Sequence, residues 1–189
     1  NVPEGQTVTV QVSGLTLQTG TAANGNWQVS LTPDQVLALA DGTNLTILAD
    51  VHNDEGIAAP QATAGLATDF TAPVIAITDV GVGADGVLNT AEAQADITVQ
   101  GTTDAQDGQV VTLTLDGVDH TATVAGGAWQ VTVPAGALTA LAEGAVTLAA
   151  TVTDAAGNPA IPATVSMTTD FTAPDITLPS LADGATLDI

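Results

Sequence analysis

The chain has 189 residues, no lysine, arginine or cysteine, and 21 acidic residues that give it a formal net charge of −21. This composition excludes nucleic acids and anionic membrane surfaces as partners, because both are bound through Lys or Arg side chains that neutralise phosphate. Hydrophobic residues make up 45% of the sequence, enough to bury a core, and no apolar run is long enough for direct membrane insertion.

The acidic side chains have no Lys or Arg to pair with, so each must be solvated, hydrogen-bonded or bound to a metal. Seventeen are aspartates and only four are glutamates. Aspartate is the carboxylate that suits tight turns and calcium loops. Since small extracellular β-domains usually carry disulfides and this chain has no cysteine, a metal ion or a sufficient core is expected to stabilise it.

Four stretches of sequence recur in the same order, which indicates tandem modules. Each pair preserves its hydrophobic pattern, and the last pair contains an identical Asp-Phe-Thr-Ala-Pro segment. The pairs are PEGQTVTVQVSG (3–14) with QDGQVVTLTLDG (106–117), GNWQVSL (25–31) with GAWQVTV (127–133), residues 37–56 with 138–157, and ATDFTAP (67–73) with TTDFTAP (168–174).

Within the complete repeat, polar and apolar residues alternate with the period of two that is typical of half-buried strands. Asp116-Gly117 separates two such runs and predicts a β-hairpin, while residues 133–144 are expected to cross between sheets with a helical turn. The fold class is therefore all-β, with tandem immunoglobulin-like sandwich modules of antiparallel Greek-key strands. The predicted strands A to G are residues 74–78, 95–101, 109–115, 118–124, 128–133, 145–153 and 163–169.

This strand assignment divides the chain into three parts. Residues 1–70 form a partial module with strands C to G and without A and B, and residues 71–171 form a complete module. Residues 172–189 correspond to strands A and B of a following module. We expect this last segment to complement residues 1–70 of a neighbouring chain or its own, because a sandwich without two strands exposes edges and core. Frayed ends are the alternative.

The predicted strand order brings several acidic loop residues together around the first linker. The loops between B and C, D and E, and F and G lie at that end of the complete module. Close carboxylates with no cation between them are unfavourable, and calcium, which takes six to eight oxygen ligands, relieves the repulsion. The expected ligands are Asp69, Asp104, Asp107, Asp154 and Asn158.

A second acidic group lies between strands A and B, in residues 78–96. Asp85-Gly86 followed by Glu92 matches the end of an EF-hand loop, but Gly81 and Gly83 stand where the first two acidic ligands belong. A different loop site near Asp170 is one interpretation, and a short helical turn that begins at residue 89 or 90 and is capped by Glu92 is the other. The candidate ligands are Asp79, Asp85, Asn89 and Glu92.

The remaining polar and aromatic residues do not indicate catalysis. Neither His52 nor His120 has a nucleophile and an orienting group in a plausible array, so no enzymatic activity is expected. Trp27, in residues 25–31, and Trp129 occupy equivalent positions on the predicted strand E of the two modules, and we expect both in the core. The loop DVHNDEG (50–56) is rich in oxygen ligands and adds Asp54 to the candidate metal ligands.

Five motifs resemble a known family: DGVLNTAEA, DGQVVTLTLDG, GGAWQVTVPAGAL, VTDAAGN and TDFTAP. They are similar to the Ig-like extender repeats of giant surface adhesins that Gram-negative bacteria export by type I secretion, the biofilm-type repeats-in-toxin (RTX) adhesins. The resemblance implies an extracellular stalk of neighbouring modules, with calcium at the junctions, that projects a distal ligand-binding region from the cell surface. The residues that match the junction motifs are Asp69, Asp104, Asp107, Asp154, Asn158 and Asp170.

A direct binding role is the alternative interpretation. An Ig-like module of a secreted protein can bind a glycan or a surface ligand through its loops, and the oxygen-rich loop 50–56 is the candidate here. An exposed aromatic side chain or a long ligand loop would favour this alternative over a structural spacer.

Overall fold

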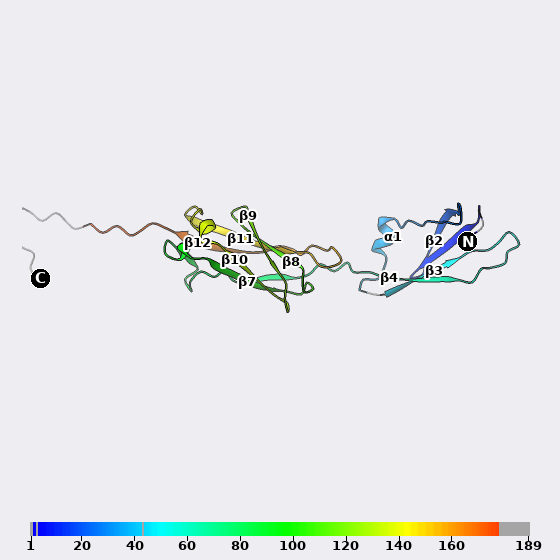
Figure 1. Cartoon of the computed structure of the whole chain (residues 1–189), viewed down its shortest axis with the longest axis horizontal. Coiled ribbons are helices and arrows are strands. Elements are labelled where there is room, and N and C mark those ends of the chain that lie inside the picture. The colour runs from blue at the N-terminus through cyan, green and yellow to red at the C-terminus, as the bar shows by residue number, and fades with distance from the viewer. Residues whose placement is uncertain (1, 3, 43, 178–189) are drawn as a thin grey trace, which may run out of the picture. The chain divides into compact units, whose positions relative to one another are not determined.

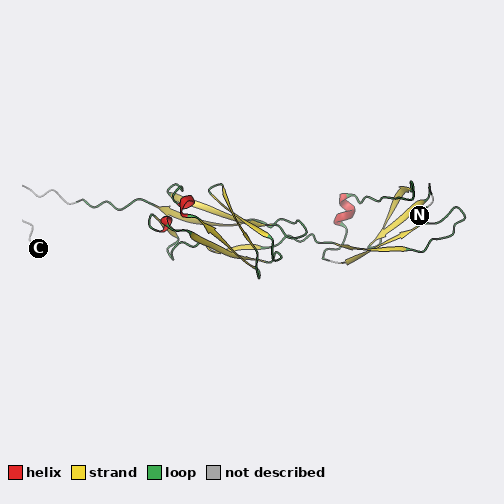
Figure 2. Cartoon of the chain, viewed as in Figure 1, coloured by secondary structure: helices red, strands yellow, loops and turns green. Residues whose placement is uncertain are grey.

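A computed structural model describes residues 2, 4–42 and 44–177, and strands dominate it (Figures 1 and 2). The chain divides into two compact units. The first contains residues 1–72 together with 156–158, and the second contains residues 73–155 together with 159–189. No helix in the described part of the chain is both long and apolar enough to cross a membrane.

The second unit is a sandwich of two sheets, with strand orders β10-β7-β5 and β6-β12-β11-β8-β9. All seven predicted strands are present, and the predicted all-β, immunoglobulin-like fold class is confirmed. The elements are β5 (Ile75–Asp79), β6 (Val87–Asn89), η1 (Glu92–Gln94), β7 (Ile97–Thr103), β8 (Val110–Leu115), β9 (Val118–Thr123), β10 (Ala128–Val133), the short helix α2 (Ala135–Leu138), β11 (Gly144–Val152) and β12 (Ala163–Asp170).

One strand of this unit was not predicted. The three-residue β6 pairs in parallel with β12, where Val87 lies opposite Thr168 and Asn89 opposite Asp170. Its middle residue, Leu88, is fully buried. The segment between β5 and β7 therefore covers the edge of the larger sheet and also contributes to the core.

The core lies between the two sheets because alternate residues of each strand face inward. In β10 the buried residues are Trp129, Val131 and Val133, and the residues between them are exposed. Leu113 of β8 and Leu148 of β11 face them from the other sheet and are fully buried.

The predicted hairpin at Asp116-Gly117 is confirmed. Asp116 has a φ of 48° and Gly117 a φ of 77°, and Leu115 pairs with Val118 directly across the turn. Two consecutive positive φ values are typical of a type I′ turn, which matches the twist of the flanking strands. Ser13 and Gly14 repeat this geometry in the first unit, with φ values of 49° and 83°.

The first unit has a single sheet with strand order β2-β1-β3-β4. This order corresponds to β9-β8-β11-β12 of the second unit. Its small core contains Val8, Val10, Val12, Leu17, Leu39 and Leu45. The elements are β1 (Thr7–Val12), β2 (Leu15–Thr21), the short helix α1 (Pro33–Leu37), β3 (Asn44–Asp50) and β4 (Ala62–Ala67).

The prediction that residues 25–31 form a strand equivalent to β10, with Trp27 in the core, was wrong. These residues form no strand, and Trp27 is 40% exposed while Trp129 is 2% exposed. In the second unit every residue of β10 pairs with β7. The described part of the first unit has no counterpart of β7. Since a strand needs a neighbour for its backbone hydrogen bonds, residues 25–31 remain irregular.

The predicted start of a following module falls mostly outside the described residues. Residues 171–177 have no regular secondary structure. The strands expected in the rest of 172–189 lie beyond residue 177 and remain a prediction.

Candidate functional site

The repeated Asp-Phe-Thr segment after β12 is bound to a carboxylate from the preceding crossover. The Glu143 carboxylate accepts hydrogen bonds from the backbone N–H of Phe171 at 2.8 Å and from the hydroxyl of Thr172 at 2.6 Å. Asp170 accepts the backbone N–H of Thr172 at 3.1 Å, which forms an Asx-turn. The linker therefore leaves the second unit in a defined conformation.

The same arrangement recurs after β4 in the first unit. The Asp41 carboxylate accepts the backbone N–H of Phe70 at 2.6 Å and the hydroxyl of Thr71. Asp69 accepts the backbone N–H of Thr71 at 3.2 Å. In each unit we call the carboxylate with its Phe and Thr partners the carboxylate clamp. The clamp explains why Thr recurs, because its hydroxyl binds the carboxylate, and the Asx-turn explains why Asp recurs. Phe contributes its backbone N–H alone to the clamp.

Both clamp carboxylates are held in their charged form. The Thr71 hydroxyl, and then the Phe70 N–H, lower the pKa of Asp41 below its ordinary value. The Thr172 hydroxyl, and then the Phe171 N–H, lower the pKa of Glu143 in the same way. Donors that bind the carboxylate form favour it over the protonated acid.

Asp41 and Glu143 were not among the residues predicted from the sequence. Pairing residues 37–56 with 138–157 without a gap places Asp41 opposite Ala142 instead of Glu143. A one-residue gap pairs Asp41-Gly42 with Glu143-Gly144, and in the structure both carboxylates indeed have the same partners. The sequence does contain a signal for these two residues: in both repeats an acidic residue followed by glycine precedes the recurring linker.

At the opposite end of the second unit, the predicted ligand loops come together. Asp104 accepts the backbone N–H of Val74 at 2.6 Å, which ties the β7–β8 loop to the start of β5. Gln106 of the same loop accepts the backbone N–H of Ala155 at 2.9 Å, in the β11–β12 loop. Asp107 accepts the backbone N–H of Gly126 at 2.8 Å, in the β9–β10 loop. All three loops therefore lie at one pole, as the strand order predicted.

Asp154 lies next to these contacts and is 6% exposed. The chain has no Lys or Arg that could neutralise this buried carboxylate. The side-chain amide of Asn158 donates a hydrogen bond to the carbonyl oxygen of Asp69 at 3.1 Å and another to that of Thr71 at 3.5 Å. All three residues belong to the first unit. Within the second unit, the donor set at this pole consists of the carboxylates of Asp104, Asp107 and Asp154 and the amide oxygen of Gln106, the hard ligands that calcium prefers.

The second predicted group, between β5 and β7, is only partly assembled. Asp79 accepts hydrogen bonds from the N–H of Gly81 and from the side chain of Gln100, and these donors, in that order, lower its pKa. Asn89 accepts the backbone N–H of Glu92 at 3.0 Å, while Glu92 accepts that of Asn89 at 3.0 Å. This reciprocal pair is the predicted capping arrangement at the turn before η1.

The same loop nevertheless brings two of the predicted carboxylates to one place. A Cβ atom on Gly83 would lie 3.0 Å from Oε1 of Glu92 and 3.3 Å from Oδ1 of Asp85. Both oxygens therefore lie close to Gly83, and that of Asp85 also accepts the backbone N–H of Val87 at 3.2 Å. The Oε1 atom of Glu92 is distinct from the Oε2 atom that takes part in the capping pair.

In the first unit, hydrogen bonds to residues outside it hold the oxygen-rich loop 50–56. Asp54 accepts a hydrogen bond from the side-chain amide of Gln6, and Asn53 accepts the backbone N–H of Ile57 at 2.7 Å. Within the residues that the structure describes, no group of three or more His, Cys, Asp or Glu side chains lies close enough to hold a metal ion. A calcium site here would therefore also need amide, backbone or water oxygens, all of which calcium accepts.

Solved structures of bacterial ice-binding adhesins are similar to this chain. A Ca²⁺-stabilised adhesin that helps an Antarctic bacterium to reach out and bind ice is 30% identical, with a TM-score of 0.59, over 92% of this chain and 42% of that one. A 1.5-MDa bacterial ice-binding adhesin, in a structure that concerns host cell surface retention, is 27% identical with a TM-score of 0.55, over 90% and 55%. An immunoglobulin-like domain of the M. primoryensis ice-binding adhesin is 34% identical over 51% of this chain and 96% of its own length, with a TM-score of 0.38.

The chain thus spans about half or less of the length of the first two of these structures. No protein-family model matches the sequence, and no curated protein is significantly similar to it.

Proposed function

The chain belongs to the Ig-like extender repeats of bacterial surface adhesins, and from that premise we propose that it is a segment of a stalk. The stalk would project a distal ligand-binding region away from the cell surface. The chain's own contribution is mechanical: each module passes the direction of the chain to the next through its linker.

The observation that carries this proposal is the carboxylate clamp. Asp41 in the first unit and Glu143 in the second bind the Phe and Thr residues of the same linker sequence. A spacer needs the chain to leave each module at a fixed angle, and hydrogen bonds to both a backbone N–H and a side-chain hydroxyl supply that constraint. A catalytic or ligand-binding module would not need the same exit geometry in both copies.

Calcium is the proposed second constraint. The residues that would hold it are those predicted from the loops, namely Asp69, Asp104, Asp107, Asp154 and Asn158 at the first linker, with Asp170 at the second linker, Asp54 in the first unit, and Asp79, Asp85, Asn89 and Glu92 between β5 and β7. The buried Asp154 carboxylate, and the approach of the Asp85 and Glu92 carboxylates beside Gly83, support this proposal. When bound, calcium would neutralise carboxylates that have no Lys or Arg partner in this chain.

Calcium dependence would also suit export. Inside the cell, where calcium is scarce, repulsion among the carboxylates favours an extended chain. Outside, calcium with dissociation constants of order 10⁻⁴–10⁻³ M, as in other extracellular modules, would favour the folded form. We therefore propose an extracellular location at the bacterial surface after type I secretion, as part of a biofilm-type RTX adhesin.

Small-angle scattering of the whole chain in 10 mM calcium and in chelator tests the proposal. A stalk segment is expected to give the larger maximum dimension and the narrower distance distribution in calcium. An unchanged distance distribution, together with an unchanged melting temperature, would show that calcium does not stiffen the linkers. The clamps would then be the only proposed constraint on them. A glycan array probed with the same protein tests the alternative, and specific binding there would replace the spacer by a binding module.

A further inference from the structure

Strand β10 is an unprotected edge of the complete second unit. It is the last strand of its sheet and pairs with β7 on one side only. The other edge strands of this unit have features that discourage pairing with another chain: β9 contains Asp119, β5 ends in Asp79 after a break in its register, and β6 has only three residues. Residues 128–133 of β10 contain no charge and no proline, and they pair with β7 in an unbroken register. An edge strand of this kind pairs readily with another strand.

The hydrogen-bonding pattern shows which backbone groups of β10 face outward. The carbonyl oxygen of Gly127 accepts a backbone hydrogen bond from the end of β7, so the odd-numbered residues of β10 bond to β7 and the even-numbered residues point away from it. The outward groups of Ala128 bind Ala125 in the adjacent turn. The N–H and C=O groups of Gln130 and Thr132 therefore face the open edge. Within the described residues, they have no backbone partner on that side.

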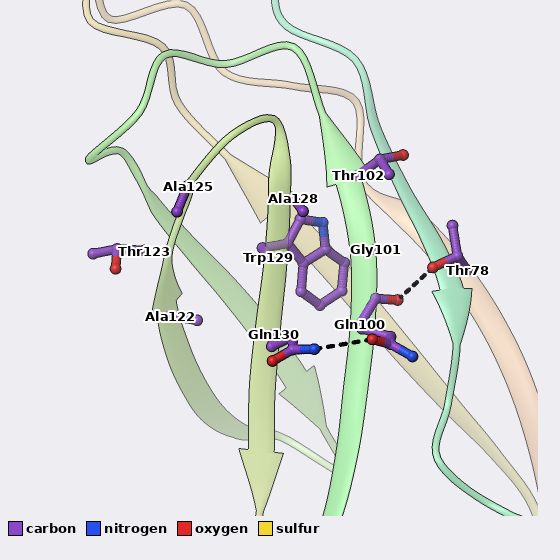
Figure 3. A pocket seen from close by; sticks show the side chains of 10 residues that line it. All are labelled: Thr78, Gln100, Gly101, Thr102, Ala122, Thr123, Ala125, Ala128, Trp129 and Gln130. Carbon is purple, nitrogen blue, oxygen red and sulfur yellow. Dashed lines mark hydrogen bonds between the residues drawn. The ribbon is translucent and has the colours of Figure 1, made fainter.

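The surroundings of this edge are open and uncharged. A hollow of about 740 Å³ lies over β10, and Gln130 lines it together with the small residues Ala122 and Thr123 of β9 (Figure 3). The chain has no acidic residue between Asp119 and Glu143. In the described part of the second unit, the other acidic residues lie in loops, in η1 or at the last residue of a strand. The charge of this unit is thus concentrated away from the middle of β10, and salt at 0.15 M screens it over about 8 Å.

We propose that the second unit associates laterally with a second copy of this chain by antiparallel pairing of the two β10 edges. Gln130 of each copy lies opposite Thr132 of the other copy. This register alone uses all the outward backbone groups of both residues. The neighbouring registers would place one of them opposite Ala128, whose groups are already bound, or opposite Pro134, which has no N–H.

The chemistry of the edge identifies a second copy as the partner. An edge without carboxylates offers a basic peptide no attraction of its own. A second β10 supplies the matching backbone donors and acceptors, and it places the uncharged side chains of Gln130 and Thr132 opposite each other. Stable interfaces typically bury about 1,000 Å² or more, so one six-residue edge is small for the purpose. Single modules therefore associate weakly, and several modules in one array associate more strongly.

Antiparallel pairing also fixes the relative direction of the two chains. Strand β10 begins beside the pole where Asp107 binds Gly126, and it leads into the crossover that carries Glu143 to the exit linker. Two chains joined through β10 therefore run in opposite directions. As a consequence that rests on the proposed stalk function, this contact would join stalks that extend toward each other from two facing surfaces.

Cysteine trapping in the full chain tests the pairing, because the chain has no cysteine of its own. Chains with Gln130→Cys and with Thr132→Cys are mixed and treated with oxidised glutathione, and their intact masses distinguish the mixed dimer from the two homodimers. In the proposed register the mixed pair lies directly opposite, with a distance of about 5.5 Å between Cα atoms that a disulfide spans. The two like pairs lie diagonally at about 7–8 Å, which a disulfide does not span. The expected result is the mixed dimer without either homodimer.

A chain with Thr147→Cys measures the dimer that random collision gives, because Thr147 is exposed on β11, in the other sheet. An excess of one homodimer, all three dimers in statistical proportions, or no dimer above the level of Thr147→Cys would overturn the proposal. These readouts do not involve calcium or the linkers, so their failure is separate from a failure of the stalk function.

Sedimentation equilibrium of the cysteine-free chain at high concentration provides a second measurement. Thr132→Asp places a charge on the β10 edge of both copies and should abolish self-association. Thr147→Asp adds the same charge away from this edge and should leave self-association unchanged. Equal self-association of the two variants would show that β10 is not the interface and would overturn the proposal.

Discussion

The Glu143 carboxylate lies 2.8 Å from the backbone nitrogen of Phe171, the second residue of the repeated linker sequence. The same carboxylate oxygen accepts the hydroxyl of Thr172. This contact joins the crossover that follows β10 to the point where the chain leaves the module. The Glu143 side chain thus fixes the direction in which the backbone leaves the module. This direction is therefore sensitive to the charge of one carboxyl group.

The clamp is expected to open in acid. The hydrogen bonds lower the pKa of Glu143, so the folded form binds its proton less readily than the unfolded chain does. Its contribution to stability is therefore fully present above the ordinary glutamate pKa of about 4.3 and is lost as the pH falls through the lower folded value. The backbone amide resonance of Phe171 should shift with a midpoint below about 4.3.

Glu143→Gln provides the control for that titration. Glutamine keeps an acceptor oxygen but does not titrate, so the acid shift of the Phe171 amide should disappear while the resonance stays near its neutral-pH position. Asp41→Asn should do the same for Phe70 in the first unit, independently. A Phe171 shift that persists in Glu143→Gln would assign the transition to a group other than Glu143 and contradict the clamp.

The features that sequence analysis predicted correctly are those fixed by short-range chemistry. The Asp116-Gly117 hairpin needs only two residues that tolerate positive φ between alternating strands. The convergence of the loops at Asp104 and Asp107 follows from strand order alone. Residues 25–31 carry the same pattern as β10 but form no strand, because strand formation also requires the neighbour β7, which is distant in the sequence.

In the candidate site, too, local features could be predicted from the sequence, and features that depend on distant residues could not. The Asp of the linker was noticed because it recurs. Asp41, which binds the two linker residues after it, lies in a crossover where one inserted residue hides the correspondence with Glu143. An ungapped comparison of the two repeats cannot reveal this correspondence, because it requires a one-residue gap. The capping role of Asn89 and Glu92 was foreseen because caps are local, whereas the approach of Asp85 and Glu92 beside Gly83 depends on how the whole loop folds.

Calcium is expected to raise the melting temperature through Asp154. At 10 mM calcium, a site with a dissociation constant of 10⁻⁴–10⁻³ M adds about 1.4 to 2.7 kcal/mol to the free energy of unfolding. For a module of this size that corresponds to about 6 to 20 °C. Asp154→Asn should remove at least about half of this rise in calorimetry, because it removes a charged ligand that is nearly buried.

Asp119→Asn is the matched control for Asp154→Asn. Asp119 lies on β9, where it accepts the hydroxyl of Thr114, and it is not among the predicted ligands. Its substitution should leave the calcium-dependent rise unchanged. If both variants lose the rise equally, the effect comes from net charge and general screening, and a specific site at Asp154 is wrong.

Two substitutions of Glu92 separate capping from metal binding in the β5–β7 segment. Glu92→Gln keeps an acceptor for the Asn89 N–H, so stability in chelator should change by less than about 0.5 kcal/mol. Glu92→Ala removes the acceptor and should cost about 1 kcal/mol in chelator. If the carboxylates beside Gly83 hold calcium, both variants lose stabilisation by calcium; if the residue serves only as a cap, Glu92→Gln behaves like the unchanged chain in both conditions.

Gly101→Ala is expected to be the most damaging single-methyl change in the second unit. The added Cβ would lie 1.9 Å from the carbonyl oxygen of Ala76 and 2.4 Å from the Trp129 ring, so either β5 or the indole must move. We expect the free energy of unfolding to fall by about 3 kcal/mol or more, as measured by urea denaturation, with a red shift of tryptophan emission. Gly136→Ala in α2 has no heavy atom within 4 Å of the new Cβ, so it should leave stability unchanged or raise it by up to about 1 kcal/mol. If Gly101→Ala is as stable as Gly136→Ala, the close packing of β5 and of the Trp129 indole against Gly101 does not constrain this sheet.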